Sequence, residues 1–141
     1  METNEQTTFV LVKPDGVRRG LIGEVIGRLE RKKLRIREMK MLRLDENFAS
    51  QHYAEHTGKP FFPALINFIT SGDVVAMAVQ GEEAVSVVRT LMGETDPKKS
   101  APGTLRGDFG LEMSQNIVHG SDSEASAVRE LALYFPDLSK G

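Results

Sequence analysis

TTFVLVK (residues 7–13) is a run of β-branched and aliphatic side chains that stops at the turn-forming sequence PDG (residues 14–16). A run of this kind, closed by Pro and Gly, predicts a buried strand. A second, nearly continuous apolar run follows SGD (residues 71–73) and covers residues 74–79, where it predicts another buried strand. The other elements follow from the sequence on either side of these two strands.

Amphipathic helices are expected after both strands, at residues 22–32 and 84–92, because apolar side chains recur there at helical spacing. Between the first helix and the second strand, residues 34–44 begin with the alternation of a strand. The phase shifts near Glu38, which permits a bulge. A third strand is therefore expected in this segment.

Two segments interrupt this alternation. Residues 45–70 predict a hairpin of two short helices separated by TGKP (residues 57–60). Residues 93–113 contain several Pro and Gly residues and are too long for an ordinary connector. A loop of this length is either disordered or functional, and its specific polar content favours a functional loop.

The order of the elements is strand, helix, strand, helical hairpin, strand, helix and a final short strand at Ile117. Split βαβ units in this order favour a ferredoxin-like α+β fold, with an antiparallel four-stranded sheet covered on one face by helices. At 141 residues, with 40% hydrophobic side chains, the chain suits a single domain over residues 1–141.

Composition narrows the classes of function. The net charge of −2 gives no reason to expect specific nucleic-acid binding. The absence of cysteine excludes disulfides and thiolate catalysis, and it fits a reducing compartment. The N-terminus lacks a signal pattern, and no apolar run approaches the roughly 20 residues needed to span a bilayer. We therefore expect a cytoplasmic protein without a membrane partner.

His119 lies in NIVHGSDS (residues 116–123), which predicts a short strand running into a capped helix. Ser121 followed by Glu124 is typical of a capping box, and apolar residues recur at helical spacing as far as Phe135. Helix N-termini attract anions, so a neutral imidazole just before one could act as a nucleophile toward a phosphoryl group. A single histidine before a helix is, however, more often a surface or structural residue.

Three polar side chains near the long loop could converge on phosphate: Arg89, Thr95 and Arg106. Guanidinium groups match phosphate oxygens in both geometry and charge, which suits a polyphosphate clamp. The alternative for Arg89 is that it caps the carbonyls of its own helix, and the alternative for Arg106 is that it is solvated.

Several separated blocks of the sequence closely resemble nucleoside diphosphate kinase over about residues 7–135. The matching blocks occur in order: KPDG (residues 13–16), RTLMGET (residues 89–95), APGTLRGDF (residues 101–109) and NIVHGSDS (residues 116–123). The resemblance implies ping-pong transfer of the γ-phosphate of a nucleoside triphosphate, typically ATP, to a nucleoside diphosphate. It makes His119 the nucleophile through Nδ1, with Glu130 and Ser121 orienting its ring.

The resemblance further implies a nucleotide site whose residues are spread along the chain. In it Lys13, which also belongs to the catalytic group, reaches the phosphates and the sugar, and Asn116 contacts a ribose hydroxyl. Phe61 stacks on the base, which suits an enzyme that accepts every base, and Tyr53 lines the pocket. The β- and γ-phosphates are held by Arg89, Thr95 and Arg106.

The resemblance also implies Mg²⁺ delivered with the nucleotide and a homo-oligomer, either a tetramer or a hexamer. No dense carboxylate cage is present, which agrees with a metal bound largely through phosphates. Two positions depart from the family pattern: Gln115 stands where many members have arginine, and Tyr134 where many have tryptophan. These departures bear on rate and assembly.

Two alternatives from other classes remain at this point. HYAEH (residues 52–56) matches the H-x-x-E-H pattern of inverted zinc peptidases, in which two histidines on one helical face bind the metal. A non-enzymatic RNA-binding or regulatory module is the other, because the same layout of sheet and helices serves such proteins.

Overall fold

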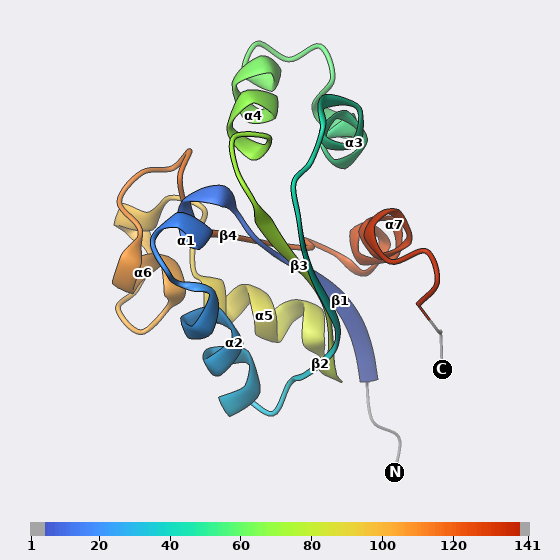
Figure 1. Cartoon of the computed structure of the whole chain (residues 1–141). Coiled ribbons are helices and arrows are strands. Elements are labelled where there is room, and N and C mark those ends of the chain that lie inside the picture. The colour runs from blue at the N-terminus through green and yellow to red at the C-terminus, as the bar shows by residue number, and fades with distance from the viewer. Residues whose placement is uncertain (1–4, 139–141) are drawn as a thin grey trace.

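The computed structural model describes residues 5–138 and contains a four-stranded antiparallel sheet (Figure 1). The strands lie in the order β2-β3-β1-β4, which confirms the ferredoxin-like α+β prediction. Their bounds are β1 Glu5–Val12, β2 Arg35–Leu42, β3 Val74–Glu82 and β4 Val118–Gly120. The two continuous apolar runs of the sequence thus form the central pair, β1 and β3.

Seven α-helices and two short 3-10 helices accompany the sheet within the described residues. Those before β3 are α1 Pro14–Arg18, α2 Ile22–Arg31, α3 Glu46–His52, η1 Ala54–His56 and α4 Phe62–Ile69. Those after β3 are α5 Ala84–Met92, η2 Pro97–Lys99, α6 Leu105–Phe109 and α7 Glu124–Tyr134. The predicted hairpin corresponds to α3, η1 and α4, and the long loop contains η2 and α6.

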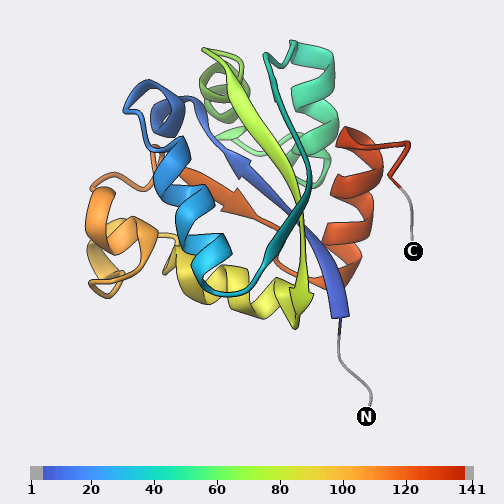
Figure 2. The ribbon, with the colours of Figure 1, turned by 60° about the horizontal axis from the view of Figure 1, so that its bottom comes forward.

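Helices cover both faces of the sheet, so the expectation of one covered face was wrong (Figures 1 and 2). On one face, Val25 of α2 and Val88 of α5 pack in a cluster with Val10 of β1. On the other, Ala49 of α3 and Tyr134 of α7 pack in a second cluster with other strand residues. Strands buried on both faces lack the polar alternation of a half-solvated sheet, and the continuous apolar runs already carried this information.

The bulge expected near Glu38 is confirmed, because the pairing of β2 with β3 shifts register between Ile36 and Glu38. The predicted turn at residues 14–16 was wrong in detail, since Pro14 begins the short helix α1. Proline is favourable at the first helical position, where its missing N–H would have had no partner and its fixed φ suits the helix.

The start and the buried face of α7 also differ from the expectation. Its N-cap is Ser123, whose hydroxyl accepts from the N–H of Ser126, and Ser121 lies outside the helix. The N–H of Ser121 donates to the carbonyl of Phe9 at 3.1 Å, so Ser121 prolongs the pairing of β4 with β1. The helix buries Glu130. Val128 is 65% exposed, although it belongs to the apolar residues at helical spacing that predicted the buried face.

Among the helices of residues 5–138, none combines the length and the apolar character required to cross a membrane.

The buried face of α2 and the exposed face of α7 can be compared by replacing one valine on each with alanine. Val25 is fully buried, so Val25→Ala is expected to lower the free energy of unfolding by about 2 kcal/mol through lost burial and a cavity. Val128→Ala should change it by less than about 0.5 kcal/mol. Urea unfolding of both proteins measures the difference, and equal losses would contradict the assigned faces.

Candidate active site

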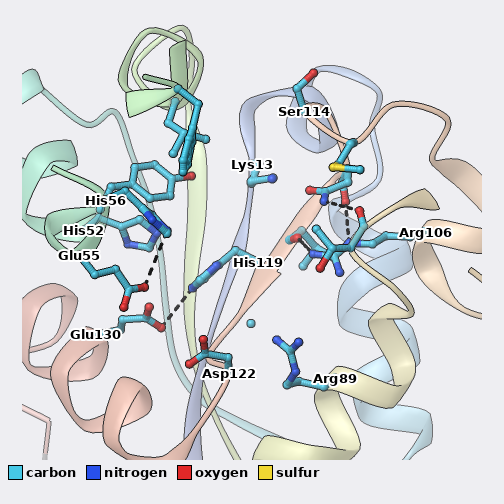
Figure 3. A pocket seen from close by; sticks show the side chains of 18 residues that line it. Lys13, His52, Glu55, His56, Arg89, Arg106, Ser114, His119, Asp122 and Glu130 are labelled. Carbon is cyan, nitrogen blue, oxygen red and sulfur yellow. Dashed lines mark hydrogen bonds and ion pairs between the residues drawn. The ribbon is translucent and has the colours of Figure 1, made fainter. Parts of the chain in front are cut away.

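A cavity of about 590 Å³ opens between the α3–α4 hairpin and the loop that precedes β4 (Figure 3). It collects the predicted residues from distant parts of the chain, with the exception of Ser121. Those that line it are Lys13, Tyr53, Phe61, Arg89, Thr95, Arg106, Asn116, His119 and Glu130. The long loop is therefore part of the cavity wall through Thr95 and Arg106.

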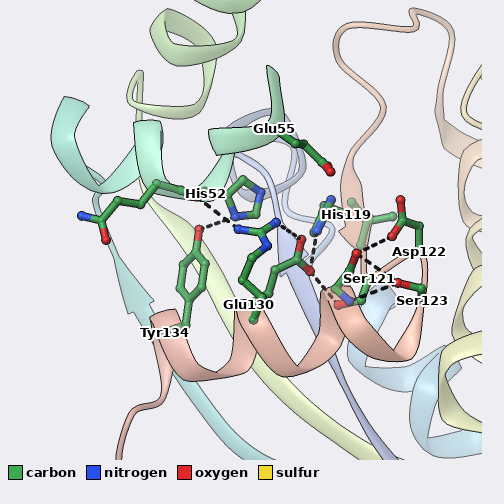
Figure 4. A network of polar contacts seen from close by, with 12 residues as sticks. His52, Glu55, His119, Ser121, Asp122, Ser123, Glu130 and Tyr134 are labelled. Carbon is green, nitrogen blue, oxygen red and sulfur yellow. Dashed lines mark hydrogen bonds and ion pairs between the residues drawn. The ribbon is translucent and has the colours of Figure 1, made fainter. Parts of the chain in front are cut away.

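His119 lies in β4 and is held from behind by α7 (Figure 4). Its Nε2 is 3.1 Å from Oε1 of Glu130, and the hydroxyl of Ser121 donates to the same oxygen at 2.6 Å. Burial alone would raise the pKa of Glu130, but the hydrogen bonds from His119 and Ser121 outweigh it and hold that pKa below its usual value. Glu130 is thus an ionised carboxylate on the buried face of α7, and it fixes the ring of His119.

Positive charge gathers on the cavity wall opposite α7. Lys13 is 9% exposed, and its ammonium group has no hydrogen bond within residues 5–138. Burial, followed by repulsion from Arg106, lowers the pKa of Lys13 to about 8. Arg89 points into the cavity from α5 and makes no ion pair with any described residue (Figure 3). Neither cation forms an ion pair with a carboxylate of the described residues, so the site favours a polyanion.

Arg106 is buried and ties the loop to β4. Its guanidinium donates to three carbonyl oxygens: Asn116 at 3.3 Å, Gly93 at 3.2 Å and Val118 at 2.6 Å. Burial, and then the nearby Arg89, lower the pKa of Arg106 to about 10. The alternative of a merely solvated arginine is wrong, and the loop position depends on this side chain.

Ile117, two residues before His119, has a backbone conformation that is rare for a β-branched residue. Its φ is 76°, and the N–H of Val118 donates to the carbonyl of Asn116 at 2.8 Å, which closes a strained γ-turn. Buried Asp15 accepts the N–H of Ile117 at 3.0 Å, and the N–H of Lys13 donates to the carbonyl of Ile117 at 2.8 Å. The start of α1 therefore holds the turn that aims β4 into the cavity.

Other residues of the cavity wall are suited to an aromatic group and a sugar. Phe61 is 43% exposed at the start of α4, with Tyr53 on the same side of the cavity. The side-chain amide of Asn116 donates to the carbonyl of Thr95 at 2.9 Å, while its Oδ1 is buried without a partner among the described residues. A buried acceptor without a partner can accept a hydrogen bond from a hydroxyl group of a ligand.

Sequence reasoning missed three residues of the site: Asp15, Asp122 and, in its actual role, His52. Asp122 lines the cavity from the turn after β4, within the same block that contained His119. His52 is 2% exposed and packs against the ring of His119, with centroids 4.8 Å apart. Because α3 ends at His52, His52 and His56 do not share a helical face, and the zinc-peptidase alternative was wrong.

An imidazole fixed by a carboxylate and facing unpaired cations is suited to accept a phosphoryl group. Together with the fold, these features define a phosphotransferase. Helices pack on both faces of the sheet, an arrangement that does not favour the RNA-binding alternative.

The chain belongs to the nucleoside diphosphate kinase family, whose model matches residues 6–139. It is 62% identical over 132 residues to the nucleoside diphosphate kinase of Archaeoglobus fulgidus, covering 94% of this chain and 87% of that protein. It is also 62% identical over 130 residues to that of Rubrobacter xylanophilus, covering 92% and 98%. The structure of the Halobacterium salinarum enzyme in complex with CDP superposes with a TM-score of 0.92 at 52% identity, covering 94% of this chain and 89% of that one. The chain is thus an enzyme that binds nucleoside phosphates and transfers phosphate between nucleotides.

The γ-turn can be tested with two glycine substitutions. A Cβ at Gly16 would lie 2.9 Å from the carbonyl oxygen of Ile117, whereas one at Gly23 in α2 meets nothing within 4 Å. Gly16→Ala should therefore lower the free energy of unfolding by about 1–3 kcal/mol and reduce activity, because it pushes on the strained turn. Gly23→Ala should raise it by about 0.4–1 kcal/mol. Chemical unfolding and the transfer rate check both, and an unchanged Gly16→Ala protein would refute the contact.

Nucleotide affinity should fall as pH rises through about 8, the lowered pKa of Lys13. The ammonium form attracts phosphate, so Lys13 contributes below that pKa and loses its contribution above it. The Kd of ADP, measured by calorimetry, should rise by up to about tenfold per pH unit above pH 8. Lys13→Arg is the control, because its guanidinium stays charged and should flatten the profile. A flat profile for the unmodified enzyme would contradict the role of Lys13.

Proposed function

We propose that the chain transfers the γ-phosphate of a nucleoside triphosphate, typically ATP, to a nucleoside diphosphate through a phosphohistidine on His119. The observation that carries this is the contact between Nε2 of His119 and Glu130. It engages one ring nitrogen and leaves Nδ1 without a partner among residues 5–138, on a ring that lines the cavity. Nδ1 is therefore the nucleophilic atom.

The transfer then proceeds in two halves of a ping-pong cycle. The lone pair of Nδ1 forms a bond to the γ-phosphorus, the bond from that phosphorus to the β–γ bridging oxygen breaks, and the diphosphate leaves with the electron pair. The ring keeps its proton on Nε2 and becomes positive, and Glu130 balances that charge. In the second half an oxygen of a different diphosphate attacks the phosphohistidine and restores the neutral ring.

Lys13, Arg89, Thr95 and Arg106 hold the β- and γ-phosphates in this proposal. Positioning and charge neutralisation supply most of the catalysis of phosphoryl transfer, and these residues lie around one cavity. The guanidinium of Arg106 has five N–H groups, and those that do not donate to its three carbonyl partners are available to bind phosphate oxygens.

The nucleoside lies between the α3–α4 hairpin and Asn116 in this proposal. Phe61 stacks on the base, Tyr53 lines the same wall, and the unpartnered Oδ1 of Asn116 accepts a ribose hydroxyl. Stacking tolerates a change of base, which fits exchange between different nucleotides. The Halobacterium salinarum enzyme was solved in complex with CDP, which supports a nucleotide as the ligand of this chain.

Mg²⁺ is proposed to arrive with the nucleotide. Among the described residues, the group of potential metal ligands at the cavity contains a single carboxylate, Glu130, so the cavity offers no carboxylate cage. A cavity without such a cage fits a metal held mainly by phosphate oxygens and water. When bound, the ion neutralises charge on the phosphates.

A homo-oligomer, either a tetramer or a hexamer, located in the cytoplasm, completes the proposal. Edge strand β2 supports assembly, because it exposes Met39 (52%) and Met41 (56%). Apolar side chains exposed along an unpaired edge are typical of a surface that another chain covers.

His119→Ala tests the nucleophile. Incubation with γ-labelled ATP should leave acid-labile label on the unmodified protein and none on His119→Ala, and the transfer rate should fall by at least about a thousandfold. His56→Ala is the matched control, because it removes an imidazole from the same cavity without touching Glu130, and it should still be labelled. Transfer and labelling that persist in His119→Ala would refute the proposal.

A further inference from the structure

Three potential metal ligands from different elements lie close together, and one of them is the nucleophile: His52 of α3, His119 of β4 and Glu130 of α7 (Figure 4). One ligand atom from each can be chosen so that all lie within 4.8 Å of one another. Within residues 5–138, His56, the third histidine of the chain, does not belong to this cluster.

His52 shows an unexplained feature in this cluster. The side chain is 2% exposed, and its Nδ1 lies 3.2 Å from the hydroxyl of Tyr134. Its Nε2 is buried and has no partner within residues 5–138, although the ring stands edge-on to His119 with centroids 4.8 Å apart. Buried polar atoms are nearly always satisfied, so an orphaned ring nitrogen beside the nucleophile indicates a missing ligand.

We infer that His52, His119 and Glu130 form a site for a divalent transition-metal ion of the Zn²⁺ class, and that the ion switches off the nucleophile. Two imidazoles and one carboxylate suit Zn²⁺, whereas Mg²⁺ prefers oxygen ligands. Tetrahedral ligands about 2.0–2.1 Å from zinc lie roughly 3.3 Å apart. The 3.1 Å between Nε2 of His119 and Oε1 of Glu130 already matches that spacing. One ligand atom from each of the three residues lies within 4.8 Å of the others, so no pair of these atoms has to close by more than about 1.5 Å.

The surroundings complete the site. When Nδ1 of His52 donates to Tyr134, the lone pair of Nε2 is free for the metal, and such an outer partner is typical of metal-binding histidines. Ser121 likewise fixes the carboxylate of Glu130. The side chain of His119 is 25% exposed to the cavity, which gives the ion a path and leaves the fourth position to water.

The location of one proton explains how the metal inhibits. A neutral His119 ring has a single N–H, and in the catalytic state that proton is on Nε2, facing Glu130. A metal that takes the lone pair of Nε2 forces the proton onto Nδ1, which then has no lone pair for phosphorus. Conversely, the phosphorylated ring keeps a proton on Nε2 that a metal would have to expel. A metal on Nε2 therefore weakens phosphorylation of Nδ1, and a phosphoryl group on Nδ1 weakens metal binding at Nε2. This conclusion rests on the proposed role of Nδ1.

Cobalt titration of the full chain tests the site directly. We expect visible absorption of four- or five-coordinate Co²⁺ that saturates at one equivalent and is lost when Zn²⁺ is added. His52→Gln should weaken Co²⁺ binding at least tenfold. His56→Gln is the matched control, because His56 forms the other histidine–carboxylate pair of the described residues, with Nε2 3.8 Å from Glu55, and it should bind Co²⁺ like the unmodified protein.

Kinetics and the phosphorylated enzyme provide independent readouts. With free Zn²⁺ set by a chelator buffer and Mg²⁺ in excess, kcat should fall, and saturating nucleotide should not restore it. His52→Gln should be at least tenfold less sensitive, relative to its own metal-free rate. Phosphorylated enzyme freed of nucleotide should bind Co²⁺ at least tenfold more weakly, a comparison that needs no variant to fold.

Three results would each overturn the inference: no Co²⁺ absorption at one equivalent, equal affinity in His52→Gln, or equal affinity of the two phosphorylation states. The cobalt spectrum does not require phosphate transfer. Failure of the protein to become phosphorylated would therefore count against the proposed function, while the titration would still decide the metal site.

Discussion

The γ-turn at Ile117 is the constraint on which the site depends. A positive φ at a β-branched residue costs on the order of 1–3 kcal/mol, and it persists because Asp15 and Lys13 bind both backbone polar groups of the residue. The turn directs neighbouring side chains to different places: Asn116 to the cavity wall, Ile117 into the core and His119 toward Glu130. The first strand therefore supplies the centre of the sheet and, through the helix that follows it, the support of the nucleophile.

The sequence predicted most of the fold because its strongest patterns belong to the best-buried elements. The runs at residues 7–13 and 74–79 form the central strands, and even the bulge near Glu38 was visible as a shift of phase. The start and face of α7 were wrong because Ser121 and Glu130 serve the site instead of the helix. Apolar periodicity cannot reveal a buried carboxylate whose partner lies in another element.

The site could be predicted only where a motif or a family resemblance named its residues. Those residues, with the exception of Ser121, do line one cavity, yet the contacts that hold them in place were found only in the three-dimensional structure. Asp15 seemed part of a turn, and His52 belonged to a motif that predicted the wrong chemistry. Both act through contacts with residues far away in the sequence, which no local pattern records. The lowered pKa of Lys13 could not be predicted from a local pattern either, because it depends on burial and on the distant Arg106.

Arg106 joins two roles that are usually separate in an enzyme. Its guanidinium fastens the segment around Gly93 to the backbone of Asn116 and Val118, and the same group faces the cavity. Lysine cannot reproduce a planar group with several fixed donors, so even Arg106→Lys, which retains the charge, should lose contacts that hold the cavity wall in place. The kinetic defect of any variant at this position consequently mixes lost substrate attraction with altered scaffolding, and rate constants alone cannot apportion the two.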